Sequence, residues 1–195
     1  TSWALYGGVH PKPYGNAICT AMIKQLLRQG WIEKVDTLQV HPMPDKLLNA
    51  GSYVWGRMED PQIAQTDEHW RVSVPDWKNI KGSFRSQFAG LKVLHSDVVR
   101  SEFTYTFEGN SLGVYVLAGP DAGVLKVYVD EGTVPHSVNL FHRHSRGLHY
   151  PRIVILAEGL KAGRHTVTVR IDPSRDSSGQ GSAARILNFA TNAEP

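Results

Sequence analysis

The chain has 195 residues, of which 41% are hydrophobic and 20% charged, proportions that are ordinary for a folded globular protein. Its 21 basic and 18 acidic residues give a formal net charge of +3, and the basic residues are scattered singly, which argues against a nucleic-acid-binding face. No apolar stretch approaches ~18 residues, so no transmembrane helix is expected, and the single cysteine, Cys19, excludes a disulfide framework within the chain.

The N-terminal sequence does not look like a signal peptide. It lacks a charged region followed by a long apolar one, and it does not begin with Met. We therefore interpret Thr1 as an internal cut in a longer protein, made by processing or truncation.

The first segment is expected to form a turn followed by a helix. Residues 7–15 contain several Gly and Pro residues, which interrupt helices. From Asn16 onward, apolar side chains recur at helical spacing and form one stripe: Ile18, Cys19, Met22, Ile23, Leu26 and Leu27. With Asn16 as N-cap and Gly30 as C-terminal stop, the pattern predicts a helix over about 16–29.

The middle of the chain shows little sustained periodicity. Short strands are expected at Leu38–Val40 and at Trp70–Val74, and Pro42 and Pro44 suggest a connection between two structural units. We therefore assign residues 36–90 to a linker and packing segment.

From about residue 91 the pattern is that of short strands. Phe103, Tyr105 and Phe107 alternate with threonines, and turns rich in Gly, Pro and Asp follow at regular spacing. Further strands are expected at 112–116, 124–130, 153–156, 166–171 and 184–190. The sequence therefore predicts a mainly β fold, a jelly-roll-like β-sandwich over 91–195, preceded by a loop and one helix.

His10 lies in the string Gly-Gly-Val-His-Pro-Lys-Pro-Tyr-Gly-Asn, directly before the predicted helix. This order of loop, His-Pro, Gly and amphipathic helix resembles the last sequence block of SGNH (GDSL-like) hydrolases. The resemblance implies that residues 1–35 are the C-terminal end of an SGNH α/β domain. It also implies that His10 is the base that takes the proton from a serine nucleophile. The alternative is a turn histidine bonded to backbone.

Two departures from the family bear on activity. Gly7 stands where the family usually has an Asp that orients the histidine, and the chain contains no Gly-Asp-Ser nucleophile block, no oxyanion blocks and no Gly-x-Ser-x-Gly elbow. The chain is therefore expected to be an ester hydrolase only if a longer or associated chain supplies the nucleophile, and to be inactive alone.

The β segment also contains strings that resemble the accessory sandwiches of bacterial carbohydrate esterases. They include Gly119-Pro-Asp-Ala-Gly123, Leu148-His-Tyr-Pro151 and Gly163-Arg-His-Thr-Val167. The resemblance implies a domain that binds or frames a polysaccharide. Aromatic rings stack on pyranose faces, and the candidate rings are Trp55, Trp70, Trp77 and Tyr150. The alternative for each ring is packing in the core or between domains.

No metal site and no cofactor are expected. His142 and His144 would share a face if they lay on a strand, as a zinc pair does, but no Cys or carboxylate follows at ligand spacing. Asp121 and Asp130 are interpreted as turn formers rather than calcium ligands.

These observations lead to one interpretation and two alternatives. We interpret the chain as the C-terminal fragment of an SGNH-family carbohydrate esterase that removes acyl groups, expected to be acetyl, from a glycan. The alternatives are a stand-alone carbohydrate-binding or structural β-sandwich module and one subunit of a split hydrolase. The expected partners are a glycan and either a second copy of the chain or the missing hydrolase part, with no nucleic acid and no membrane. A secreted or periplasmic bacterial location is expected.

Overall fold

The computed structural model describes residues 3–32, 40, 46–49, 52–130 and 132–193, and the chain forms two compact units, Thr1–Leu48 and Asn49–Pro195. The expected strand at Leu38–Val40 lies largely outside the described residues.

The first unit consists of two helices joined by a turn, α1 (Trp3–Tyr6) and α2 (Pro13–Ile32). α2 begins at Pro13, before the expected Asn16, because proline is well suited to the first helical position, where an amide hydrogen is not needed. Its first backbone bond runs from the amide of Asn16 to the carbonyl of Lys12, at 2.8 Å. The turn needs Gly15, since a Cβ there would collide with the carbonyl oxygen of Tyr6.

Gly30 does not end the helix, contrary to the sequence-based expectation. The helix continues to Ile32 because a glycine within a helix costs only about 1 kcal/mol and Gly30 does not adopt the left-handed conformation of a C-terminal cap. Four apolar side chains of the predicted stripe are exposed, from 46% at Leu27 to 67% at Leu26, with Met22 and Ile23 between them. No described helix is both long enough and apolar enough to span a membrane.

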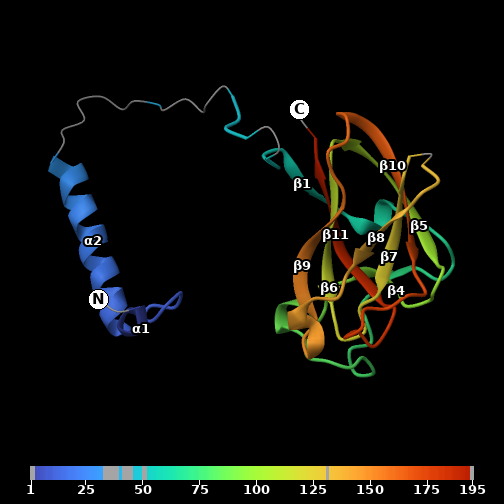
Figure 1. The fold of residues 1–195 in the computed structure, drawn as a ribbon, viewed down its shortest axis with the longest axis horizontal. Coiled ribbons are helices and arrows are strands. Elements are labelled where there is room, and N and C mark those ends of the chain that lie inside the picture. Colours follow the sequence, from blue (N-terminus) through green and yellow to red (C-terminus); the bar gives the residue numbers. More distant parts are fainter. Residues whose placement is uncertain (1–2, 33–39, 41–45, 50–51, 131, 194–195) are drawn as a thin grey trace. The chain divides into compact units, whose positions relative to one another are not determined.

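The second unit is a sandwich of two antiparallel sheets (Figure 1). The strands of the first sheet are, in spatial order, β3 (Arg71–Ser73), β4 (Val93–Ser96), β11 (Ala184–Asn192), β6 (Leu112–Ala118) and β9 (Tyr150–Ala157), with β1 (Gly56–Glu59) also paired to β11. The second sheet runs β2 (Gln65–Thr66), β5 (Glu102–Gly109), β10 (Gly163–Ile171), β7 (Val124–Val129) and β8 (His136–Asn139). Three 3₁₀ turns lie between described strands of this unit: η1 (Pro61–Ile63), η2 (Ser86–Phe88) and η3 (Arg143–Arg146).

The core lies between the two sheets, as alternation along the strands requires. On β5, Phe103, Tyr105 and Phe107 are buried, while Thr104 and Thr106 face outward and bond to threonines of β10. β6 and β11 supply the opposite layer of the core, including Leu112, Val114, Val116, Ile186 and Phe189. Of the residues that the structure describes, 39% are in strands and 19% are helical, the 3₁₀ turns included. The predicted mainly β sandwich with one main helix is therefore confirmed.

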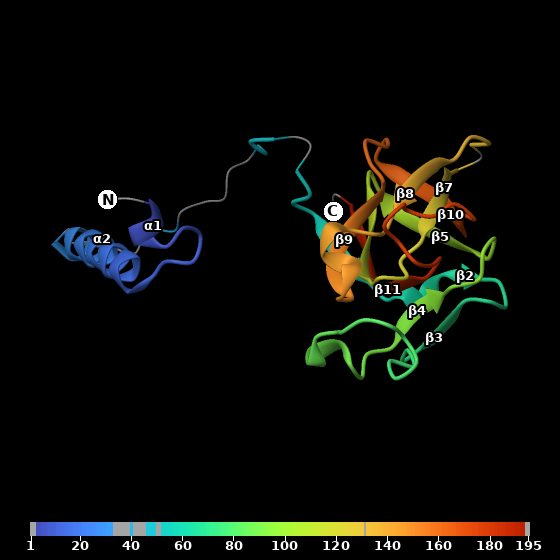
Figure 2. The same cartoon turned by 60° about the horizontal axis from the view of Figure 1, so that its bottom comes forward.

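The sandwich includes more of the chain than the sequence suggested. We expected it to begin near residue 91, whereas β1, β2 and β3 come from the 36–90 segment and pair with β11, β5 and β4. Figure 2 shows β3 and β4 next to β11 in one layer, with β5, β10, β7 and β8 in the other. β1, β2 and β3 have only two to four residues each. Strands of that length are too short to show an alternating pattern in the sequence.

Candidate functional site

His10 lies on the turn between α1 and α2, exposed at the surface of the first unit. The turn is fixed by the backbone, with the amide of Lys12 donating to the carbonyl of Tyr6 at 2.9 Å and Gly7 at a φ of +106°. No side chain in the described residues bonds to the His10 imidazole, and residues 1–32 contain no Asp or Glu that would orient it.

The structure does not bring the four candidate aromatic residues together. Trp70 is only 4% exposed and packs edge-on against Phe103 in the core, so its ring is not available to a sugar. Trp77 is half-buried, stacked on Phe84 with ring centroids 4.6 Å apart and edge-on to His149. It belongs to a second, smaller hydrophobic cluster. Trp70 is therefore a core residue, contrary to its expected role as a sugar platform.

An open groove lies on the outer face of the first sheet, lined by Tyr53 and Gly56 but not by Trp55, which lies between them in the chain and is 38% exposed. The groove has a volume of about 240 Å³. The strand register places Met58, Ala190, Gly113 and Ile155 in one row across β1, β11, β6 and β9. Their chain neighbours, such as Phe189 and Val114, point into the core, so this row faces outward. Small side chains in the middle and long ones on both sides produce the hollow.

One end of this groove is aromatic and polar. Tyr53 lines it and donates a hydrogen bond from its hydroxyl to Glu158 Oε2 at 2.9 Å; this bond is the main cause of the raised pKa of Tyr53. On the far side of Tyr53 is a second, more polar hollow lined by Asn110, Glu158 and Asn192. An apolar trough bordered by an aromatic ring, an amide and a carboxylate suits an amphipathic ligand such as a sugar.

Asn192 holds the segment that carries Tyr53 and Trp55 in place. This residue is 5% exposed; its Oδ1 accepts a bond from the backbone amide of Trp55 at 3.1 Å, and its Nδ2 donates to Asn110 Oδ1 at 2.9 Å. The hydroxyl of Ser111, which also lines the groove, donates to Asn110. Ser111 is thus bonded to an amide oxygen, and no histidine or carboxylate is among the residues that line this groove.

Tyr150 lies at a different place, against two histidines. Its ring stacks on that of His142 with centroids 5.3 Å apart and an angle of 14°, and His144 is also 5.3 Å away. His142 does not lie on a strand, as a zinc pair would require, because it is the residue that caps η3. Its Nδ1 accepts the backbone amide of His144 at 3.4 Å and is therefore used locally.

Among the described residues, no group of three or more His, Cys, Asp or Glu side chains is arranged to hold a metal ion. Asp121 is paired with Arg185 at 2.6 Å and 2.9 Å, and Asp130 bonds to the backbone of Thr166 and to His165. Both carboxylates therefore have partners within the protein.

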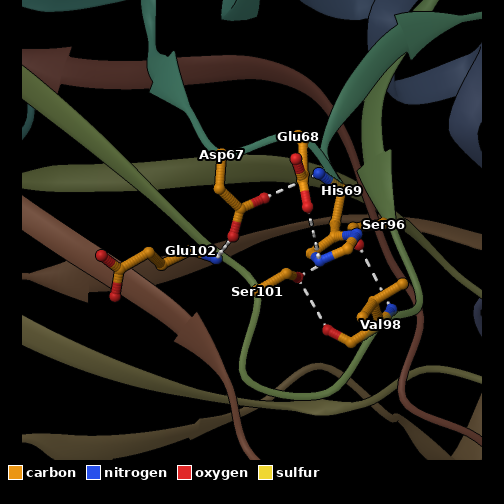
Figure 3. Close-up of polar contacts among 7 residues, drawn as sticks. All are labelled: Asp67, Glu68, His69, Ser96, Val98, Ser101 and Glu102. Carbon is orange, nitrogen blue, oxygen red and sulfur yellow. Dashed lines mark hydrogen bonds and ion pairs between the residues drawn. The ribbon is translucent and has the colours of Figure 1, made fainter.

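A third hollow, next to β2 and β5, combines acidic and hydroxyl groups (Figure 3). The carboxylate of Asp67 accepts the backbone amides of His69 at 2.9 Å and Glu102 at 2.6 Å. On the neighbouring loop, the Ser101 hydroxyl donates to the carbonyl of Val98 at 2.7 Å. These groups fix the conformation of two turns, and we interpret the cluster as structural.

One Ser–His pair was not visible from the sequence. Ser73 Oγ and His95 Nε2 are 2.8 Å apart on the adjacent strands β3 and β4. Burial, with Arg71 and Arg185 close by, lowers the pKa of His95 to about 4. A histidine with so low a pKa is a weak base at neutral pH, so the pair is poorly suited to nucleophilic catalysis. Only a residue contact map would have shown this pair, because 22 residues separate its members.

The chain was compared with known proteins. No family model and no curated protein sequence matches it. Among solved structures, it is similar to a two-domain esterase active on acetylated mannans, with 15% identity and a TM-score of 0.65 over 95% of this chain and 48% of the esterase. The same esterase co-crystallised with mannopentaose gives 14% identity and a TM-score of 0.63 over the same shares.

A weaker likeness, with a TM-score of 0.44 and 12% identity, links 70% of this chain to 95% of a family 6 carbohydrate-binding module from Clostridium cellulolyticum in complex with xylose. The chain thus spans about half the length of the esterase that it resembles, and at these identities the likeness to that esterase concerns the fold. The chain shares its β-sandwich architecture with a part of that two-domain protein.

Proposed function

We propose that the β-sandwich binds a neutral glycan in the groove beside Tyr53, and that the first unit is the His-loop and closing helix of an SGNH-type carbohydrate esterase. The groove carries this proposal: an apolar trough of sugar-like size ends at a tyrosine hydroxyl, an amide and a carboxylate. The likeness in fold to an esterase active on acetylated mannans supports the choice of an acylated glycan as ligand.

In the complete enzyme, His10 would take the proton from a serine supplied by another part of the protein and return it to the leaving alcohol. The order of the turn, His10-Pro11 and α2 supports this role. The sandwich would hold the polysaccharide, and the expected location is the cell exterior or periplasm, where such substrates occur.

A stand-alone glycan-binding module is the second candidate. The observation that favours it is that residues 1–32, which carry α1, His10 and α2, contain no Asp or Glu to orient the imidazole. Both candidates require glycan binding by the sandwich, and they differ only in the role of His10.

The test of glycan binding is titration with acetylated manno-oligosaccharides by calorimetry. Substitution Tyr53→Ala removes the aromatic wall, and Ala190→Leu fills the floor of the groove, so each is expected to weaken binding at least about tenfold. The matched control is Ile63→Ala, which changes another exposed apolar residue outside the groove and is expected to leave affinity unchanged. Unchanged affinity in both groove variants would rule out the groove as the glycan site.

A further inference from the structure

A compact cationic surface lies at the start of β9, apart from the groove. From Gly132 to Ala157 the sequence contains no Asp or Glu but three arginines, Arg143, Arg146 and Arg152. In the described part of the chain, no carboxylate pairs with any of the three. This surface therefore has positive charge without an internal counter-ion.

The arginines border the stacked rings described above. Arg143 Nε lies 3.3 Å from His144 Nε2, and Arg152 follows Tyr150 by two residues on the same face of β9. Desolvation lowers the pKa of His142, and the charges of Arg152, His144 and Arg143 lower it further. We call the set His142, Arg143, His144, Tyr150 and Arg152 the arginine–tyrosine patch.

The geometry points to a carboxylate-bearing sugar: we propose that the arginine–tyrosine patch binds a uronate residue of an acidic polysaccharide. Guanidinium groups bind carboxylates through two parallel hydrogen bonds, and a pyranose ring packs against aromatic side chains. This inference goes beyond the proposed function, since neither His10 nor the groove takes part.

A sugar fits the patch better than a nucleic acid or a membrane does. Nucleic-acid grooves need a stripe of cations that follows many phosphates, whereas this cationic set covers one 3₁₀ turn and one strand end. A membrane-binding surface needs larger clusters of basic residues with apolar anchors. The small size of the patch corresponds to one or two charged sugar residues.

The experiment compares oligomers of polygalacturonate with the same oligomers after chemical reduction of their carboxylates, titrated by calorimetry at 150 mM salt. The unmodified protein is expected to bind the acidic oligomer at least about tenfold more tightly than the reduced one. Arg143→Gln combined with Arg152→Gln is expected to abolish that difference. Single Arg143→Gln, at an exposed position, keeps the test valid if the double variant does not fold.

The matched control is Arg164→Gln combined with Arg175→Gln, which removes the same charge from exposed positions elsewhere. It is expected to change binding less than about twofold. The proposal would be overturned if the control variant lost as much affinity for the acidic oligomer as the Arg143→Gln and Arg152→Gln protein does, or if the acidic and reduced oligomers bound equally tightly. It would also be overturned if a DNA oligonucleotide or phosphatidylglycerol vesicles bound as tightly as the acidic oligomer.

The same variants separate this proposal from the proposed function. The Arg143→Gln and Arg152→Gln protein should still bind neutral manno-oligosaccharides, and Tyr53→Ala should still bind polygalacturonate. If the groove variant keeps its affinity for manno-oligosaccharides, the groove is wrongly assigned. If the double arginine variant keeps its affinity for polygalacturonate, the arginine–tyrosine patch is wrongly assigned.

Discussion

At the scale of single residues, His95 shows how packing alters an ordinary side chain. It lies on β4 between Arg71 of β3 and Arg185 of β11, its direct partners in the two neighbouring strands. Burial and these two guanidinium groups lower its pKa from 6.5 to about 4, and Asp97 opposes the shift. The imidazole is therefore neutral in the folded protein and bonded to Ser73.

This lowered pKa predicts a loss of stability on mild acidification. As the pH falls, the unfolded chain binds a proton at His95 before the folded chain does. The contribution of neutral His95 to the free energy of unfolding is therefore complete above pH 6.5 and is lost as the pH falls towards 4. Its size is on the order of 3 kcal/mol. His95→Gln, which keeps a hydrogen-bonding group, should flatten the urea-denaturation free energy between pH 6.5 and 4. The same slope in both proteins would contradict this account.

The aromatic residues show which features of the candidate site could not be predicted from the sequence. Composition identified Trp55 and Trp70 as equivalent candidates, yet Trp70 lies in the core and Trp55 is 38% exposed, in the chain between two residues that line the groove. Burial depends on which strands pair, and single-residue chemistry does not contain that information. Tyr53 was not a candidate, because nothing local marks its contact with Glu158, 105 residues later.

At the scale of elements, long alternating strands were predictable and short ones were not. β5 and β10 have eight and nine residues with clear alternation, whereas β1 has four and β2 two. The groove depends on the short strand β1, whose pairing with β11 places Met58 next to Ala190. The groove was therefore not predictable from the sequence, for the same reason as the strand.

Helix α2 provides a prediction at this scale. Met22, Ile23, Leu26 and Leu27 are exposed, and burying such side chains contributes about 1.5–3 kcal/mol each before entropy is counted. We expect this stripe to drive self-association or association with the rest of the proposed esterase. Leu26→Asp with Leu27→Asp should lower the mass in solution, measured by sedimentation, or the melting temperature.

The control for this prediction places the same two charges on the opposite side of the helix, as Ala21→Asp with Gln25→Asp. This variant should retain the mass and melting temperature of the unmodified protein. If the Leu26 and Leu27 variant also retains both, the apolar stripe has no partner and its interpretation as a covered surface is wrong.

At the scale of the whole molecule, the two proposed glycan-binding surfaces and His10 lie in different units. The second unit has the groove and the arginine–tyrosine patch, whereas His10 lies in the first. A histidine without a nucleophile does not catalyse ester hydrolysis beyond what free imidazole does. The glycan-binding experiments therefore test the sandwich alone, and the esterase assignment needs a separate measurement.

That measurement is the hydrolysis of p-nitrophenyl acetate by the chain alone and by the chain joined or mixed with a part that supplies a Gly-Asp-Ser block. Alone, the chain should react no faster than free imidazole at equal concentration, and His10→Ala should remove only that background. In the completed enzyme, His10→Ala should lower kcat by about 10³-fold or more while leaving manno-oligosaccharide affinity unchanged, because the base acts on the serine and not on the bound sugar. His69→Ala, at an exposed position outside the groove and the arginine–tyrosine patch, is the control for a histidine outside the reaction. A saturable rate of the isolated chain that His10→Ala abolishes would reveal a nucleophile within these 195 residues and would replace the fragment interpretation with that of an autonomous hydrolase.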